Sequence, residues 1–246
     1  MSAPPILAVE DLVAGYEPGL PIVNGVSMHA ADGEIVGVLG PNGAGKSTLI
    51  KAMAGLVATS RGKVRFGGRD ITKTPAHLRI RGGLAFTPQT ENVFTSMSVD
   101  DNLKLAAGLL PAPRRPSRIA AMFETFPDLA RQRTLLAGRL SGGQRQMLAI
   151  ARALLIEPKA LMLDEPSAGL SPKAVSAVFA SLAEIRKTGV TIVLVEQNAK
   201  AALAIADRAY ILVQGRNRHE GLASALGSDP MIAALYLGGA GTEDAA

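Results

Sequence analysis

The sequence predicts an α/β fold with a mixed, mostly parallel sheet, an inserted helical segment and an antiparallel β region near the N-terminus. Three observations predict it. Short apolar runs alternate with stretches of helical periodicity, which is the pattern of a parallel sheet covered by helices. From about residue 98 to 155 the pattern is helical. Glycine and proline separate the three apolar runs that open the chain, as between strands joined by turns.

Each apolar run is long enough for a buried strand and too short to cross a bilayer. A helix is expected over 46–56, where an amphipathic stretch follows the third run and a glycine-rich loop. The interval 110–116 contains three prolines and is interpreted as a loop between two helices. The expected strands cover 6–13, 22–28, 34–39, 62–66, 84–87, 160–163 and 191–195.

The 246 residues are enough for one large domain with its own core. We expect a single domain over 1–246, with a core formed by about 1–88 and 156–237 and a helical subdomain over about 89–155. The tail, 238–246, is rich in glycine and alanine and is expected to be disordered. A secretory signal is not expected, because no basic segment leads into an apolar stretch at the N-terminus.

The composition argues against two classes of site. The net charge is +5, but the basic residues occur in small scattered groups such as Arg114 and Arg115. Aromatic residues make up only 4%, whereas nucleic-acid grooves combine a basic stripe with stacking aromatics, so nucleic acid is not an expected partner. The absence of cysteine excludes disulfides and thiolate metal sites.

Residues 40–47 read Gly-Pro-Asn-Gly-Ala-Gly-Lys-Ser and match the G-x-x-x-x-G-K-[ST] pattern of phosphate-binding loops. Glycines let backbone amides approach phosphate oxygens, and the following helix directs its positive end at the same anion. Lys46 is expected to face the β- and γ-phosphates of ATP, Ser47 to bind Mg²⁺ and Thr48 to reach the α-phosphate. The predicted nucleotide-binding residues of this segment are Gly40, Pro41, Asn42, Gly43, Ala44, Gly45, Lys46, Ser47 and Thr48.

A pair of acids, Asp164 and Glu165, follows the apolar run 160–163. The carboxyl end of such a strand lies at the edge of the sheet that also carries the phosphate loop. Asp164 is expected to hold Mg²⁺, directly or through water. Glu165 is expected to orient and polarise the attacking water. Without the phosphate loop, the same pair would be interpreted as solvated acids at a strand end.

Residues 140–144 read Leu-Ser-Gly-Gly-Gln. With the phosphate loop and the acid pair, this segment makes essentially the whole chain resemble the ABC ATPases. The resemblance implies a P-loop NTPase (RecA-like) core with an inserted helical subdomain that carries this signature. Ser141, Gly142 and Gly143 precede a helix expected from about Gln144 to residue 155, and with Gln144 they offer a second anion site. The resemblance implies that this site binds the ATP held by a second subunit, in a head-to-tail dimer.

Further positions match the family one at a time. Tyr16 follows the first strand, where the family stacks an aromatic on adenine; packing on the core is the alternative. Gln89 matches the glutamine that touches Mg²⁺ and senses the membrane subunits. The segment 91–97 after it is expected to line the groove that receives a helix of the permease.

Two positions depart from the family pattern. Ser171 stands before Pro172 where the family usually carries aspartate, so the hydrogen bonding across the dimer made by that aspartate is in question. Gln197 stands where the switch histidine is usual. Glutamine can donate a hydrogen bond to the γ-phosphate but cannot carry a proton charge, which leaves more of the catalytic burden on Glu165.

Four segments narrow the resemblance to one subgroup: 126–129, 165–172, 195–198 and 235–238. They look like the smaller ATPase of high-affinity branched-chain amino acid importers and of their urea and amide relatives. The resemblance implies two membrane permeases, a second and different ATPase, and an extracytoplasmic solute-binding protein as partners; for the isolated chain, a homodimer is the alternative to the pair of different ATPases. It also implies a place on the cytoplasmic face of the inner membrane.

Several alternatives stay open at this point. Urea, short amides or organic acids could replace amino acids as the solute, because an ATPase of this kind does not touch the solute. A soluble ABC protein of the ribosome or DNA usually has two cassettes or a long inserted arm, which this chain lacks. A lipid or lipopolysaccharide exporter is disfavoured by Gln197 and the 236–238 ending. An inactive ATPase is disfavoured because Lys46, Asp164 and Glu165 are all present.

Overall fold

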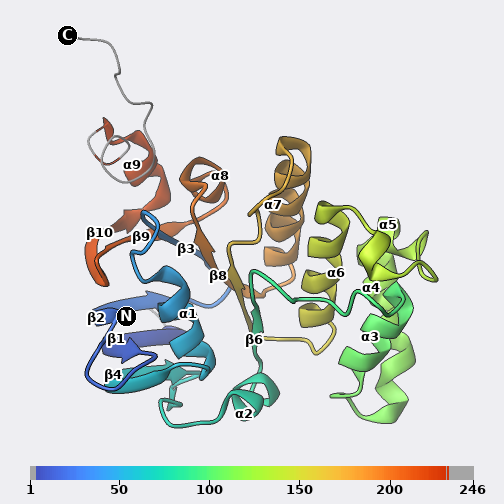
Figure 1. Cartoon of the computed structure of the whole chain (residues 1–246), viewed down its shortest axis with the longest axis horizontal. Helices are drawn as coiled ribbons and strands as arrows, with labels where there is room; N and C mark the ends of the chain where they lie inside the picture. The colour runs from blue at the N-terminus through green and yellow to red at the C-terminus, as the bar shows by residue number, and fades with distance from the viewer. Residues whose placement is uncertain (1–3, 231, 233–246) are drawn as a thin grey trace.

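The computed structural model describes residues 4–230 and 232, so the predicted tail 238–246 lies outside the described residues. Its strands form two sheets, in the orders β2-β1-β4-β5 and β10-β9-β3-β8-β7-β6 (Figure 1). The strands are β1 (Leu7–Gly15), β2 (Val23–Ala30), β3 (Ile35–Leu39), β4 (Ala58–Phe66), β5 (Arg69–Asp70), β6 (Leu84–Thr87), β7 (Ala160–Asp164), β8 (Thr191–Glu196), β9 (Arg208–Val213) and β10 (Arg216–Leu222).

The smaller sheet is antiparallel throughout, which agrees with the β region expected near the N-terminus. In the larger sheet, β9, β3, β8, β7 and β6 are parallel and only β10 is antiparallel, so the sheet is mixed as predicted. Strands β9 and β10 were not among the strands expected from the sequence. The parallel arrangement brings the carboxyl ends of β3, β7 and β8 to one edge of the sheet.

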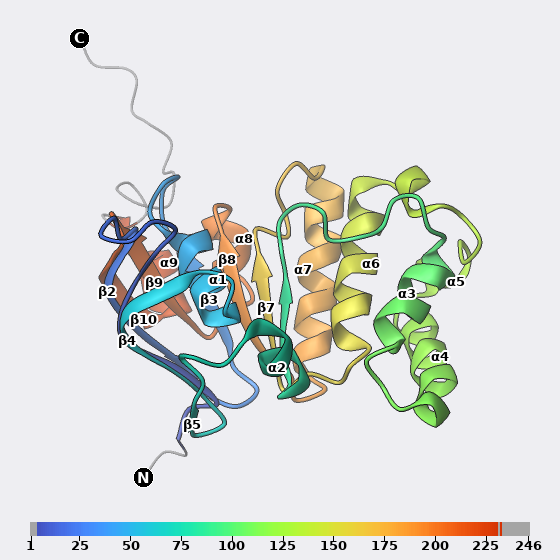
Figure 2. The same cartoon turned by 60° about the horizontal axis from the view of Figure 1, so that its bottom comes forward.

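Two short 3₁₀ helices, Ala112–Arg114 and Ala137–Arg139, accompany the α-helices. The α-helices are α1 (Lys46–Ala54), α2 (Ala76–Arg81), α3 (Val99–Ala107), α4 (Arg115–Thr125), α5 (Pro127–Ala130), α6 (Gly142–Leu154), α7 (Pro172–Arg186), α8 (Ala199–Leu203) and α9 (Ala223–Ser228). In Figure 2, α1 lies between the two sheets, while α7 and α6 stand on the other side of the larger sheet.

Two apolar cores form because the central strands are buried on both faces. In β3, Ile35 and Leu39 point to one core, and Val36 and Val38 point to the other. The first core packs the larger sheet against α6, α7 and α8. The second core packs it against α1 and the antiparallel sheet. The sheet is thereby fixed from both sides, and the loops at its carboxyl edge are set on a rigid base.

Helices α3 to α5 form a separate cluster beside α6, at the end of the molecule remote from the antiparallel sheet (Figure 1). The interpretation of 110–116 as a plain loop was wrong in part. Residues Ala112–Arg114 form a 3₁₀ helix, and α4 begins at Arg115 with Pro116 in its first turn. Proline is tolerated there because the first N–H groups of a helix have no partner within the helix.

Helix α6 begins two residues earlier than the expected start at 144. Ser141 is its N-cap, and the hydroxyl of Ser141 accepts a hydrogen bond from the amide of Gln144, 3.3 Å away. The Gln144 side chain accepts from the amide of Ser141 in return, at 3.0 Å, which completes a capping box. In the described part of the chain, no helix combines the length and the apolar character that crossing a membrane requires.

Candidate active site

The predicted phosphate loop connects β3 to α1. Gly40, Gly43 and Gly45 have φ angles of 145°, 76° and 93°, which glycine adopts without strain. A Cβ on Gly40 would lie 2.1 Å from the carbonyl oxygen of Leu212, so no other residue fits there. Gly45 is the N-cap of α1 and supplies no side-chain cap, so the first amides of this helix remain available to an anion.

Lys46 lies within this loop and is only 4% exposed. Its Nζ donates hydrogen bonds to the carbonyl oxygens of Gly40, at 2.9 Å, and Pro41, at 3.0 Å. Glu165 Oε1 is 3.9 Å from the same nitrogen. Burial lowers the pKa of Lys46, and the charges of Glu165, Asp164 and Glu196 oppose that shift. The Lys46 ammonium group thus lies at the centre of the loop, between two carbonyl oxygens and the Glu165 carboxylate.

Ser47 and Asp164 come together as the sequence predicts for two ligands of one cation. The Ser47 hydroxyl donates to Asp164 Oδ1 at 2.8 Å. Asp164 ends β7 and is 2% exposed. Burial raises its pKa, while the hydrogen bond from Ser47 and the charges of Lys51 and Lys46 lower it. A hydroxyl and a carboxylate oxygen are donors that suit Mg²⁺.

Glu165 follows β7 in a left-handed conformation, with a φ of 46°. Its amide donates to the carbonyl oxygen of Val195 at 2.9 Å, which fixes the backbone against β8. Its side chain accepts a hydrogen bond from Gln89 Nε2 at 3.1 Å. Gln89 thus contacts the predicted catalytic carboxylate, and its expected contact with Mg²⁺ stays a prediction.

Gln197 follows β8 at the same edge of the sheet, and it is exposed. Its amide donates to Glu196 Oε2 at 3.2 Å. Asn198, the next residue, accepts the amide of Ala201 and caps α8. Ser171 is the N-cap of α7 and accepts from the amide of Ala174 at 3.4 Å. Among the described residues, no hydrogen bond or ion pair is formed by the Gln197 side chain.

Glu196 was missed by sequence analysis. It is 1% exposed and accepts four hydrogen bonds from Ser167, Gln197 and Asn198. A signal for it exists in the sequence, because Glu196 ends a buried apolar strand in the same way that Asp164 does.

The signature residues lie at the start of α6, away from the phosphate loop. Within residues 4–230 and 232, no hydrogen bond or ion pair joins the segment 141–144 to 40–48. Gly143 packs closely on α7, since a Cβ there would lie 2.9 Å from that of Ala174. Tyr16, which follows β1, is 59% exposed, so it does not pack in the core and its ring is accessible to a ligand.

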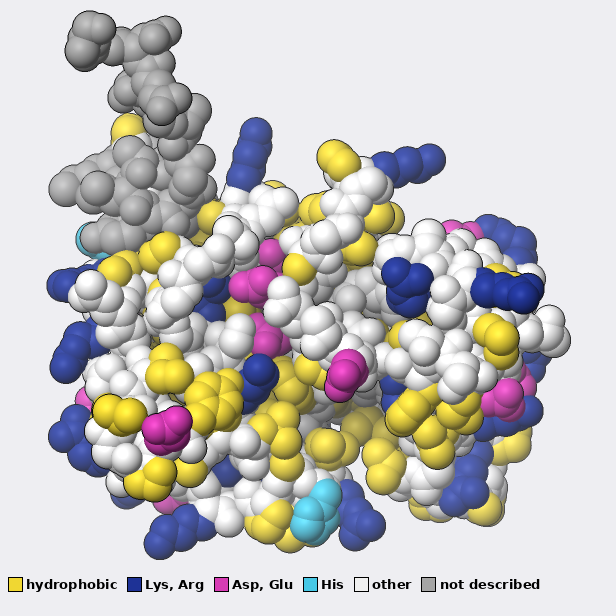
Figure 3. Space-filling view, viewed as in Figure 1, with side chains coloured by type: hydrophobic (Ala, Val, Ile, Leu, Met, Phe, Trp, Pro, Cys, Tyr) yellow, Lys and Arg dark blue, Asp and Glu magenta, His cyan; other side chains and the backbone are white. Residues whose placement is uncertain are grey.

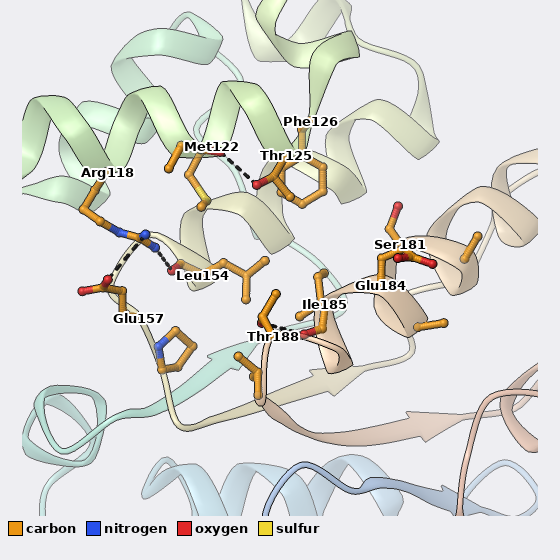
Figure 4. Close-up of a pocket in the computed structure, with 15 residues that line it drawn as sticks. Arg118, Met122, Thr125, Phe126, Leu154, Glu157, Ser181, Glu184, Ile185 and Thr188 are labelled. Atoms are coloured by element: carbon orange, nitrogen blue, oxygen red, sulfur yellow. Dashed lines mark hydrogen bonds and ion pairs between the residues drawn. The ribbon is translucent and has the colours of Figure 1, made fainter.

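Two of the hollows in the described part of the chain lie between helices and away from the signature residues. One, of about 920 Å³, lies between α4 and α7, and at its edge Arg118 pairs with Glu157 and donates to the carbonyl oxygen of Leu154 (Figure 4). None of the predicted site residues lines it. The other is a groove of about 430 Å³ between α2, α3 and α6. Glu91, Asn92 and Phe94 line this groove, so the segment 91–97 borders a groove as expected.

Figure 3 shows the charge on one face of the molecule. Acidic side chains gather near its centre, while lysines and arginines are spread around the rim. No continuous basic stripe crosses this face. Among the described residues, no group of three or more histidines or acids is arranged to hold a metal ion, so a cation at Ser47 and Asp164 needs further oxygens from phosphate or water.

Known proteins resemble this chain along most of its length. Residues 23–168 match the family described as ABC transporter. A probable branched-chain amino acid transport ATP-binding protein LivF from Archaeoglobus fulgidus is 44% identical over 90% of this chain and 94% of its own. The high-affinity branched-chain amino acid transport ATP-binding protein BraG from Pseudomonas aeruginosa is 38% identical, over 93% and 98%. The lipopolysaccharide export system ATP-binding protein LptB from Escherichia coli is 35% identical, over 94% and 97%.

Solved structures agree with this result. A nucleotide-free ATP-binding cassette from an ABC transporter is 27% identical, covers 94% of this chain and 98% of its own, and superposes with a TM-score of 0.83. Another ATP-binding cassette, in its ADP conformation, is also 27% identical with a TM-score of 0.83, over 95% and 98%. The chain therefore belongs to the ABC transporter family, as one of its ATP-binding subunits, which hydrolyse ATP.

Proposed function

We propose that this chain hydrolyses ATP to drive the import of branched-chain or other hydrophobic amino acids through a membrane transporter. The observation that carries the catalytic part is the convergence of Lys46, the Ser47–Asp164 pair and Glu165 at one edge of the sheet. The amino-acid part rests on the two relatives that are named as branched-chain amino acid transport proteins, at 44% and 38% identity.

The phosphate groups of ATP would lie on the amides of the loop 40–48 and at the N-terminus of α1. Lys46 would exchange its bonds to the carbonyl oxygens of Gly40 and Pro41 for phosphate oxygens. Tyr16, exposed beyond β1, would stack on adenine. The positive φ angles and the uncapped helix start support this assignment, since they leave the loop's amides without side-chain partners.

Ser47 and Asp164 would hold Mg²⁺, with Gln89 beside them. Bound there, Mg²⁺ would neutralise charge on the phosphates and orient them. The hydrogen bond between the Ser47 hydroxyl and Asp164 supports this assignment, because it shows that the two ligand oxygens lie next to each other. Occupancy by a cation also relieves the cost of burying the Asp164 charge.

Glu165 would polarise the water that attacks the γ-phosphate. Its carboxylate is held on one side by Gln89 and lies close to Lys46 on the other. Gln197 would donate a hydrogen bond to the γ-phosphate from the neighbouring strand end. The signature residues Ser141 to Gln144 would bind the ATP of a second ATP-binding subunit, with the amides at the start of α6 as the anion site.

The groove between α2, α3 and α6 would receive a helix of a membrane permease. Exposed Phe94, Leu105 and Leu109 surround it, and apolar groups at the surface of this kind are typical of protein contacts. Arg152 lies in the groove over the Phe94 ring, and its buried Nε has no hydrogen-bond partner among the described residues. A permease helix would cover the exposed apolar side chains of the groove and would supply a hydrogen-bond acceptor for Arg152.

In the complete complex, two permeases, a second ATPase and an extracytoplasmic solute-binding protein would act with this chain, on the cytoplasmic face of the inner membrane. Lipopolysaccharide export is the second candidate function, because the LptB proteins cover as much of the chain at 35–37% identity. The two functions predict different companions in the membrane.

Tagged full-length chain, purified gently from native membranes and identified with its companions by mass spectrometry, tests the proposal. Recovery of two permeases and a second, different ATPase is expected. Recovery of only one kind of ATPase together with lipopolysaccharide-transport proteins would favour the second candidate. Recovery of ribosomal or DNA-repair proteins without a membrane partner would contradict both.

A further inference from the structure

Glu196 joins two loops that lie far apart in the sequence. Its Oε1 accepts the amide of Ser167 at 3.0 Å, and its Oε2 accepts the hydroxyl of Ser167 at 2.9 Å. The same Oε2 accepts the amides of Gln197, at 3.2 Å, and Asn198, at 3.3 Å. One carboxylate thereby ties the turn that follows Glu165 to the loop that carries Gln197.

Burying the charged carboxylate of Glu196 costs free energy of folding. Its side chain is almost fully buried, and burial raises its pKa while the hydrogen bonds from Ser167, Asn198 and Gln197 oppose that shift. A buried carboxylate is tolerated only when its oxygens are satisfied, and well-packed apolar residues often stabilise a fold equally well. Fold stability alone therefore does not account for an acid at this position.

The link also reaches the two groups assigned to catalysis. The amide of Glu165 donates to the carbonyl oxygen of Val195, and the amide of Ser167 donates to Glu196, so the turn after Glu165 is bound to β8 at two points. The side chain of Gln197 has no hydrogen bond or ion pair within the described residues. The backbone of Gln197 is held by the hydrogen bond that its amide donates to Glu196 Oε2. Helix α8 does not need Glu196 as a cap, because Asn198 already caps it.

We propose that Glu196 is a positioning residue that holds Gln197 and the turn after Glu165 in one fixed arrangement for ATP hydrolysis. The inference rests on the proposed roles of Glu165 and Gln197. A misplacement of a reacting group by about 1 Å can cost about 100-fold in rate. Loosening both loops at once should therefore lower the turnover rate while the loop 40–48 still binds ATP.

The test compares Glu196→Gln with Asp207→Asn in the full-length chain, assembled with its partners if the chain alone does not turn over ATP. Asp207 is a matched control because its carboxylate also accepts a strand amide, that of Ile35 at 2.9 Å, but at the opposite end of β3. Glu196→Gln leaves only one acceptor oxygen. The new NH₂ group is a donor and cannot accept hydrogen bonds from the other N–H and O–H groups around it. We expect kcat to fall about 10- to 100-fold with ATP affinity changed less than about threefold. Asp207→Asn is expected to lower Tm and leave kcat unchanged.

A double-mutant cycle separates positioning from general destabilisation. If part of the effect of Glu196 runs through Gln197, Glu196→Gln should lower kcat by a smaller factor in the Gln197→Ala background than in the original chain. Additive losses, or equal kcat in Glu196→Gln and Asp207→Asn, would overturn the inference. Should Glu196→Gln not fold, Ser167→Ala removes one of the four bonds and is expected to lower kcat about threefold to tenfold, again less in the Gln197→Ala background. An unchanged kcat in Ser167→Ala would then overturn it.

The proposed function has its own control. Glu165→Gln is measured first, and full activity in that variant contradicts the catalytic assignment itself. Full activity in Glu196→Gln beside an inactive Glu165→Gln overturns only the positioning role.

Discussion

Three carboxylates, those of Asp164, Glu165 and Glu196, lie close enough to Lys46 to act on its pKa. The site therefore carries more negative than positive charge on its side chains, although ATP is itself an anion. The amides of the phosphate loop and a bound cation are the groups that offset this charge. The arrangement favours binding of ATP together with Mg²⁺ over binding of either one alone.

Glu165→Gln should separate binding from hydrolysis. The amide keeps the size of the side chain and can still meet Gln89, but it cannot accept a proton from water. We expect ATP binding to stay within about threefold of the original affinity and the hydrolysis rate to fall at least about 100-fold. Binding is measured by calorimetry and hydrolysis by phosphate release. An unaltered rate would mean that another group activates the water.

Asp164→Asn should stabilise the chain in the absence of nucleotide. Burial raises the pKa of Asp164, which means that its charged form is disfavoured in the folded state, and asparagine still offers an oxygen to the Ser47 hydroxyl. A rise in Tm of about 2–4 °C is expected, with loss of Mg²⁺-dependent hydrolysis. Thermal unfolding in the absence of ATP is the measurement. A lower Tm than that of the original chain would contradict the claim that the buried Asp164 charge destabilises the nucleotide-free chain.

At the residue scale, sequence patterns predicted the loop 40–48 and the Asp164–Glu165 pair, because these motifs combine residue type with spacing. Glu196 escaped prediction because one acid at a strand end resembles a solvated one until its burial is known. The contact between Gln89 and Glu165 also depends on packing, since the two side chains are 76 positions apart in the sequence.

Among the elements, the turn between β9 and β10 supports the phosphate loop. The amide of Gly215 donates to the carbonyl oxygen of Ala44 at 3.0 Å, and its own carbonyl accepts the amide of Asn24 at 2.8 Å. Gln214 and Gly215 both have positive φ, at 49° and 72°, as in the type I′ turns of hairpins. A Cβ on Gly215 would lie 1.9 Å from the carbonyl oxygen of Ile22.

Gly215→Ala should therefore disturb nucleotide binding from outside the loop. We expect the free energy of unfolding to fall by about 2–3 kcal/mol and ATP affinity to fall about tenfold, because the backbone at Ala44 must move. Gly189→Ala is the matched control, since its φ is also positive, at 90°, and a Cβ there meets nothing within 4 Å. Chemical unfolding and ATP titration measure both effects. If the two variants lost equal stability and equal ATP affinity, the effect would come from the positive φ alone and not from the clash with Ile22.

Strand prediction succeeded where apolar runs were bounded by glycine or proline, as at β3, β7 and β8. It failed for β10, whose sequence Arg-Asn-Arg-His-Glu-Gly-Leu is polar and largely exposed. Its partner β9 was missed although 209–213 is an apolar run of strand length, and the Gln-Gly turn that follows is a weaker hairpin signal than Asn-Gly or Asp-Gly. The start of α4 was missed because proline can open a helix as well as end one.

In the whole molecule, the phosphate loop and the signature segment 141–144 lie apart from each other. Both motifs are visible in the sequence, but the sequence does not show whether they meet within one chain. In the described structure, no hydrogen bond or ion pair joins them. Two ATP-binding subunits would complete each other's sites. The solute could not be predicted from the site residues, because none of them is assigned a contact with it.

Uptake of labelled leucine by cells that produce either the original chain or Glu165→Gln at equal level tests whether ATP hydrolysis by this chain drives amino-acid import. Urea uptake is measured in parallel, and Lys46→Ala serves as a second inactive variant. Both variants are expected to lower energy-dependent leucine uptake at least about tenfold and to leave urea uptake unchanged. Leucine uptake equal to that of the original chain, in cells whose purified Glu165→Gln protein no longer hydrolyses ATP, would contradict this role of ATP hydrolysis.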